Sequence, residues 1–69
     1  MKLSARNVLP GKVVDVKRGA TTSHIRIDIG GGAIVTASIT NEAVDELALK
    51  AGDKAAAVIK ASDVIVGKI

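Results

Sequence analysis

The sequence contains no cysteine and no aromatic residue, and these two absences limit what the chain can be. Without cysteine, neither a disulfide framework nor a thiolate metal site can form. Without Phe, Tyr or Trp, each of which buries roughly 150–250 Å², the core must consist of Val, Ile, Leu and Ala. A core of this kind in a chain of 69 residues is small. We therefore expect the chain to bury more apolar surface by associating with copies of itself.

The sequence also lacks a long apolar run, a run of like charges and a catalytic pair. No uncharged stretch approaches the ~20 residues of a membrane span, and the N-terminus has no apolar signal region. A cytoplasmic protein without a membrane partner is expected. The net charge of +3, from 10 Lys and Arg against 7 Asp and Glu, is interspersed along the chain, as in a solvated surface. No nucleophile has a base beside it, so we do not expect an enzyme.

Alternating apolar residues predict an all-β domain over residues 1–69. In the run from His24 to Ile29, Ile25 and Ile27 point inward with Ile29, and the polar residues point outward. Leu9-Pro10-Gly11 predicts a bend or the start of a strand, and Gly30-Gly31-Gly32 predicts a hairpin turn. The expected strands cover residues 12–17, 24–29, 33–39, 54–60 and 64–66.

One segment departs from the strand pattern. After Thr40, apolar residues recur at helical spacing, and Thr40 itself is a residue type that caps a helix N-terminus. We predict a short helix from about Asn41 to Leu47, and a tight corner at Ser62-Asp63. Five strands with one small helix between the third and the fourth predict a five-stranded barrel like the OB fold.

Hydroxyl and cationic side chains lie near the ends of these elements. Serine and threonine hydroxyls rotate to donate, backbone N–H groups are fixed donors, and Lys or Arg supplies charge, so such a set suits a small oxyanion. Each residue also has an ordinary role as a cap, a surface cation or a turn former. They are far apart in sequence, so only the fold or a neighbouring subunit can assemble a site. The residues are Ser4, Arg6, Thr40, Lys60 and Ser62.

These segments resemble the molbindin (Mop) family of small molybdate-binding proteins, over essentially the whole chain. The resemblance is carried by Met1 to Asn7, which includes Ser4-Ala5-Arg6-Asn7, the Gly11-Lys12-Val13-Val14 strand, Thr40 to Leu49, the Gly52-Asp53 turn and Lys60 to Val66. It implies a single Mop domain over residues 1–69 that binds molybdate or tungstate for intracellular storage, without catalysis or a cofactor. It also implies a homohexamer arranged as a trimer of dimers.

The resemblance further implies molybdate sites at subunit contacts. Carried over residue by residue, the ligands are Ser4, Ala5 (backbone), Arg6, Thr40, Lys60, Ala61 (backbone) and Ser62. Some relatives have a serine at the position of Ala43, so one hydroxyl ligand is missing here. Arg6 and Asn7 are also candidates for the subunit interface.

A second anion site near a threefold axis is another family property. The stretch in which to seek it is Gly19, Ala20, Thr21, Thr22 and Ser23. The ordinary alternative is a flexible hairpin connection, and both interpretations stay open. His24 lies on the outward face of its strand with nothing to complete a metal site, so we interpret it as a surface residue and expect no bare metal cation to bind.

Two other functions are compatible with a small barrel. One is a nucleic-acid-binding OB module, but such modules stack bases on aromatic side chains, and this chain has none. The other is a regulatory or interaction domain, since similar domains are fused to DNA-binding regulators and to importer ATPases. A sequence that begins at Met1 without another domain favours a free-standing binder.

Overall fold

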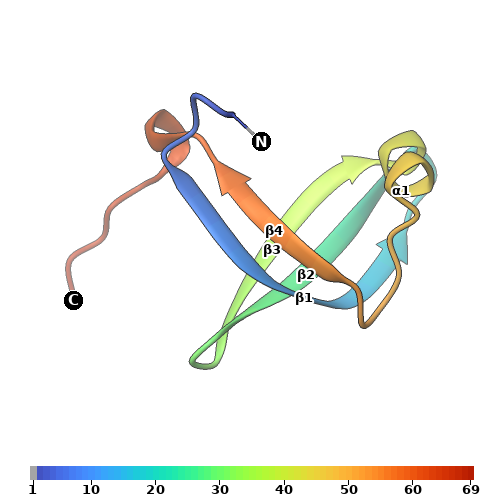
Figure 1. Ribbon diagram of the computed structural model, residues 1–69, viewed down its shortest axis with the longest axis horizontal. Coiled ribbons are helices and arrows are strands. Elements are labelled where there is room, and N and C mark those ends of the chain that lie inside the picture. Colours follow the sequence, from blue (N-terminus) through green and yellow to red (C-terminus); the bar gives the residue numbers. More distant parts are fainter. Residues whose placement is uncertain (1) are drawn as a thin grey trace.

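Four antiparallel strands curl into a half-barrel, with one short helix at one end (Figure 1). The computed structural model describes residues 2–69. The strands are hydrogen-bonded in the order β3-β2-β1-β4, so the predicted mostly-β architecture with one helix is confirmed. The elements are β1 (Asn7–Arg18), β2 (Thr22–Gly30), β3 (Ala33–Thr40), α1 (Asn41–Leu47), β4 (Lys54–Ile59) and the 3₁₀ turn η1 (Ala61–Asp63).

Strand β1 belongs to both halves of the sheet. It pairs with β4 up to Lys12 and with β2 from Lys12 to Arg18. The register with β2 shifts between Val13 and Asp15, which leaves Val14 as the extra residue of a β-bulge. A bulge bends its strand and increases the local twist. This bend lets one strand pass from the β4 side of the curl to the β2 side.

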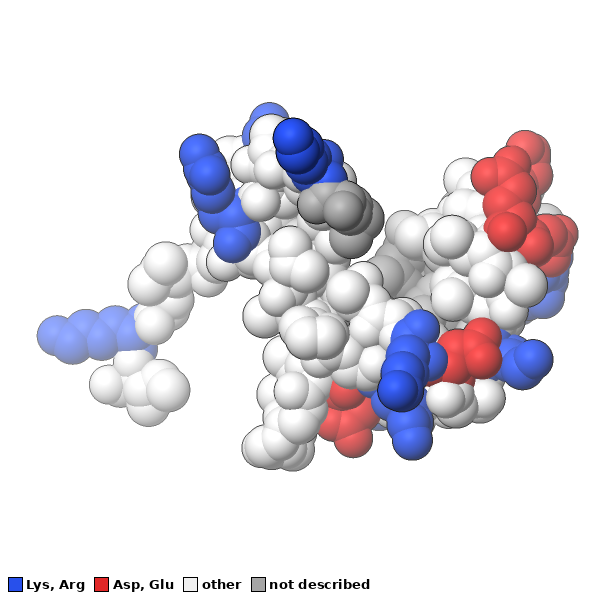
Figure 2. Space-filling model, in the orientation of Figure 1, with Lys and Arg blue, Asp and Glu red and all other residues white. Residues whose placement is uncertain are grey.

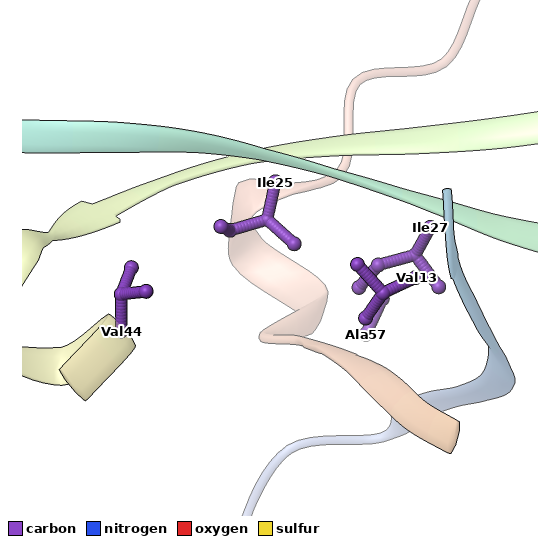
Figure 3. Close-up of a cluster of buried hydrophobic side chains, with 5 residues drawn as sticks. All are labelled: Val13, Ile25, Ile27, Val44 and Ala57. Carbon is purple, nitrogen blue, oxygen red and sulfur yellow. The ribbon is translucent and has the colours of Figure 1, made fainter. Parts of the chain in front are cut away.

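The core lies inside this curl and contains only aliphatic side chains (Figure 3). The predicted inward positions of β2 are confirmed, since Ile25 and Ile27 are buried and Ile29 is partly buried. The hairpin that follows has the expected glycine conformation, with φ values of 63° at Gly31 and 82° at Gly32. The buried cluster combines β1, β2, β4 and α1: Val13, Ile25, Ile27, Val44 and Ala57.

Helix α1 has the predicted bounds and the predicted cap. The backbone N–H of Ala43 donates to Thr40 Oγ1 at 3.1 Å, which satisfies one of the N–H groups that a helix start leaves unpaired. Val44 points from the helix into the core. The helix ends at Leu47, and Ala48 follows in the left-handed conformation with φ 50°.

Asn41, the first residue of the helix, joins the connection between β1 and β2 to the start of the helix by hydrogen bonds. Its backbone N–H donates to the carbonyl of Thr21 at 3.0 Å, and its Nδ2 donates to the carbonyl of Gly19 at 3.1 Å. Its Oδ1 accepts the hydroxyl of Ser23, which is 0% exposed. One side chain thus satisfies a fully buried hydroxyl and holds the segment that was predicted as a candidate anion site.

The predicted fifth strand at residues 64–66 is wrong. The chain leaves β4 at Ile59, makes the tight corner predicted at Ser62-Asp63 as η1, and then runs away from the sheet without regular structure (Figure 1). A strand requires a neighbouring strand for its hydrogen bonds, and within residues 2–69 this segment has none. The segment was predicted as a strand because its residues are β-branched. Without this fifth strand, the four-stranded sheet of the single chain does not close into a barrel.

The prediction of a bend or a strand start at Leu9-Pro10-Gly11 is also wrong, because β1 begins earlier, at Asn7, and runs through all three residues. Proline lacks an N–H and is tolerated in a strand only where that group needs no partner. Around Pro10, β1 pairs with β4 alone. The other edge of β1 forms no hydrogen bonds to a neighbouring strand there, so the missing N–H of Pro10 breaks no pairing on that edge. Gly11 is required for another reason: a Cβ there would overlap the carbonyl oxygen of Asp28 and approach Ile27 Cγ2 at 3.0 Å.

We predict that Gly11→Ala destabilises the fold by about 1–3 kcal/mol, the usual cost of forcing extra volume into a packed site. The overlapped atom is backbone, so no side-chain rotation relieves it. Urea unfolding at a fixed protein concentration measures the change. Gly67→Ala is the matched control, since a Cβ there meets nothing within 4 Å. Equal stability of the two variants would contradict the close approach of β1 and β2.

We also predict that Asn41→Ala costs about 1–3 kcal/mol, because it leaves the buried Ser23 hydroxyl without an acceptor. A double-mutant cycle with Ser23→Ala isolates this bond from other effects of each change. Removing both partners should cost clearly less than the sum of the single costs, since the double variant contains neither the Ser23 hydroxyl nor its Asn41 acceptor. Additive free energies of unfolding would show that the two side chains are not coupled.

Candidate functional site

The structure brings two of the predicted site segments together at one end of the sheet. Asn7 of β1 pairs with Ile59 of β4, and its Nδ2 donates to the Ile59 carbonyl at 3.1 Å. The residues just before Asn7 and just after Ile59 therefore continue from adjacent strand ends, and Figure 1 shows the N-terminal segment beside η1. We call this region the basic end: Ser4, Ala5, Arg6, Lys60, Ala61 and Ser62.

The basic end presents donors and positive charge to solvent. Ser4, Arg6, Lys60 and Ser62 are all exposed, and Ala5 is half-buried. The ion pairs found among residues 2–69 are Arg18–Asp45 and Arg26–Asp15, so neither cation of the basic end is neutralised by a described carboxylate. In η1 the turn hydrogen bonds are donated by Asp63 and Val64. The backbone N–H groups of Ala61 and Ser62 precede them, as the unpaired groups at the start of a helical turn do.

Thr40 lies at the other end of the molecule, next to α1 (Figure 1). Within one chain it does not meet Ser4 or Lys60. Its register partner is Thr22 of β2, so the structure groups Thr40 with the 19–23 segment instead. The Thr40 oxygen already accepts the N–H of Ala43, and its O–H proton remains available for donation.

The 19–23 segment exposes fewer hydroxyls than its sequence suggests. Ser23 is fully buried, and its hydroxyl points to Asn41 rather than to solvent. Thr21 and Thr22 are exposed. The segment closes with a hydrogen bond of 2.8 Å from the Gly19 N–H to the Thr22 carbonyl. Two threonine hydroxyls are therefore what this segment offers an external ligand.

A hollow of about 250 Å³ beside this segment was not anticipated from the sequence. Its walls are Lys17, Arg18, Gly19, Thr22 and His24. The alternation of polar and apolar residues places Lys17 and His24 outward on their own strands, but only the register shows that they face each other across β1 and β2. A larger and more open hollow of about 590 Å³ lies between β1, β2 and β4 near Lys12 and Lys54, and no predicted site residue lines it.

Charge is distributed unevenly along the molecule. In Figure 2 the charged side chains seen around the N-terminal segment and η1 are Lys and Arg, whereas the Asp and Glu seen on the α1 side of the molecule are accompanied by further Lys and Arg. The helix itself contains Glu42, Asp45 and Glu46. Across residues 2–69, no group of three or more His, Cys, Asp or Glu side chains is placed to hold a metal cation. Nor does this part of the chain contain a helix long and apolar enough to cross a bilayer.

Comparison with known proteins agrees with this geometry. The model of the TOBE domain family matches residues 3–66. A probable molybdenum-pterin-binding protein of Haemophilus influenzae is 48% identical over 67 residues, which cover 97% of each chain. The high-resolution structure of a molybdate-binding protein from Sporomusa ovata superimposes with a TM-score of 0.92 at 37% identity, covering 99% of this chain and all of the other.

A third comparison includes a bound ligand. ModG, a cytoplasmic molybdate-binding protein solved with molybdate bound, has a TM-score of 0.90 and 48% identity over 94% of this chain, which corresponds to 46% of the ModG chain. The four-stranded half-barrel is thus a fold shared with solved molybdate-binding proteins. By the family match and the full-length relatives, this chain belongs to the TOBE domain family and, within it, to the molybdenum-pterin-binding (Mop) proteins.

Proposed function

We propose that this protein binds molybdate, and also tungstate, as a cytoplasmic store without catalysis, at sites between the subunits of a homo-oligomer. The observation that carries the proposal is the basic end, where two distant segments bring hydroxyls, N–H groups and two cations together, and no carboxylate among residues 2–69 forms an ion pair with either cation. The molybdenum-pterin-binding relative and the molybdate-bound ModG support molybdate as the ligand.

The chemistry of the basic end matches a tetrahedral dianion. Such an ion offers only acceptor oxygens, so it is bound by groups that donate. Arg6 and Lys60 are permanent donors with positive charge, and Ser4 and Ser62 donate by rotating their hydroxyls. Charge-assisted hydrogen bonds of this kind are the stronger class. Selection between ions of equal charge then depends on the spacing of the donors, whose segments continue from the paired strand ends Asn7 and Ile59.

The position of Thr40 supports a site shared between subunits. It lies at the opposite end from Lys60, so it can join the basic end only from a second copy of the chain. The acidic residues of α1, which begins next to Thr40, favour a contact with the cations of the basic end. We assign Thr40 of a second copy, together with Ser4, Ala5, Arg6, Lys60, Ala61 and Ser62, to the molybdate site.

The C-terminal segment supports self-association independently of the ligand. Ile65 is 94% exposed and Val66 is 88% exposed, and Val64 and Ile69 are exposed as well. The same side chains would gain about 25 cal/mol per Å² of apolar surface if a second copy covered them. The outer edges of β3 and β4 also lack neighbouring strands within residues 2–69. We propose a hexamer arranged as a trimer of dimers, in which the segment 64–69 of each chain lies against another chain.

We predict that Lys60→Ala weakens molybdate binding by about 10- to 100-fold, since a hydrogen bond to a charged group contributes about 1.5–3 kcal/mol. Titration calorimetry at pH 8 measures the loss. Lys54→Ala is the matched control, because Lys54 is an exposed lysine at the start of β4, the strand after which Lys60 follows. Unchanged molybdate affinity in the Lys60→Ala variant would show that the basic end is not the molybdate site.

We predict that Ile65→Asp reduces the oligomer to smaller species, because it places a charge in the apolar contact. Native mass spectrometry reports the number of subunits directly. Far-UV circular dichroism serves as the control and should show an intact fold, since Ile65 has no part in the core of the single chain. An undiminished assembly would show that the segment is not an interface.

A further inference from the structure

The outer face of the β1–β4 pair carries an exposed apolar surface. In the register of the two strands, Val8 lies opposite Val58, and Pro10 lies opposite Ala56. All four residues are exposed, and they alternate with the buried or half-buried residues of the same strands. Val8 is 46% exposed and Val58 is 44% exposed. We call Val8, Pro10, Ala56 and Val58 the apolar strip.

Cations lie at both ends of the apolar strip. At one end the two strands continue into the basic end, which contains Arg6 and Lys60. At the other end Lys12 lies opposite Lys54. Among residues 2–69, none of these four side chains takes part in an ion pair. An apolar surface with a positive border fits a partner that is itself apolar and acidic.

Helix α1 presents a surface of this kind. Val44 faces the core, and Ala43, Glu46 and Leu47 lie together on one side of it, because residues three and four apart share a helix face. Leu47 is 65% exposed. Glu46 is exposed and takes part in no ion pair within residues 2–69. We call Ala43, Glu46 and Leu47 the helix face.

Thr40 indicates which surface the helix face would meet in a second copy. Thr40 Oγ1 accepts the N–H of Ala43 at 3.1 Å, so the threonine side chain lies beside the helix face. The proposed function brings Thr40 of one copy to the basic end of another, and the present inference rests on that proposal. The helix face then reaches the surface that adjoins the basic end, and that surface is the apolar strip.

The lengths of the two surfaces agree. Helix α1 contains 7 residues, and a rise of about 1.5 Å per residue separates its two ends by about 10 Å. A strand rises about 3.3 Å per residue, so the same distance covers about three residues of β4. At that distance from Lys60, the exposed side chains of β4 are those of Val58 and Ala56. Leu47, at the end of the helix, therefore lies over the apolar strip.

We propose that the apolar strip of one copy binds the helix face of a second copy, with Leu47 packed against Val8 and Val58. Glu46 then faces the cations of the basic end. The contact removes two exposed apolar surfaces from water, and charges of opposite sign meet at its border. The two surfaces differ, and each chain has both, so every copy can offer its helix face and accept that of another.

Cysteine cross-linking tests the contact directly, because the sequence contains no cysteine of its own. Leu47→Cys and Val58→Cys chains are co-expressed and oxidised, and the disulfides are identified by mass spectrometry. Each chain has one thiol, so a disulfide between the two variants joins two copies. It forms only where the Cα atoms come within about 7 Å. We expect this mixed disulfide as the main product. Ile34→Cys replaces Val58→Cys as the matched control, since Ile34 is 39% exposed on β3, outside the strip.

Two further variants measure the strength of the contact. Leu47→Asp should raise the concentration at which the assembly dissociates by about ten- to a hundredfold, because it removes a buried leucine and adds a charge. Glu46→Lys should also weaken association, and its effect should shrink as salt is added. Analytical ultracentrifugation over a dilution series measures both. Circular dichroism should show intact folds, since Leu47 lies outside the buried cluster, and Ile34→Asp is the control for adding a charge.

The outcomes are distinguishable from those of the proposed function. A mixed disulfide no more abundant than with Ile34→Cys, or a Leu47→Asp variant that associates like the unaltered chain, would overturn this contact. A loss of molybdate affinity in Lys60→Ala would still support the basic end in that case. The expected disulfide and weakened association, together with unaltered molybdate affinity in Lys60→Ala, would support the contact and overturn the basic end as the molybdate site. An unaltered chain that stays monomeric at every concentration would overturn both.

Discussion

The pairing of one bent strand with two different neighbours is the constraint on which the rest of this structure depends. Strand β1 pairs with β4 over its first half and with β2 over its second, and a bulge at Val14 lies close to the change of partner. Because of this division, the segment before Asn7 must lie beside the segment after Ile59. The same division places Lys17 opposite His24 at the other end of β1. The basic end and the hollow beside Lys17 are thus both consequences of one strand register.

Local features of the sequence predicted most of the individual elements. The alternation in β2 identified its buried face, the glycine run identified the hairpin, and Thr40 identified the start of the helix. These features depend on neighbouring residues and so are visible in a linear pattern. The two errors at Pro10 and at residues 64–66 have a different origin, since each depended on whether a strand had a hydrogen-bonding neighbour on a given side.

The candidate site shows the same limit. Residue type and family resemblance identified the segments of the basic end, and the structure places these two segments together. The sequence did not indicate that Thr40 lies at the end of the molecule opposite the basic end, or that the hydroxyl of Ser23 donates to Asn41. Nor did it indicate that Lys17 and His24 line one hollow. Each of these facts comes from pairing between distant segments, which periodicity within one segment does not encode.

The exposed apolar segment 64–69, which follows η1, has a consequence for how binding would depend on the concentration of the protein. If covering that segment also completes a site shared by two chains, then ligand occupancy and chain association are thermodynamically linked. A scarce chain would remain dissociated and release its cargo, whereas an abundant one would retain it. The cellular amount of the protein would then set the level of free oxyanion as much as the affinity of any one site does.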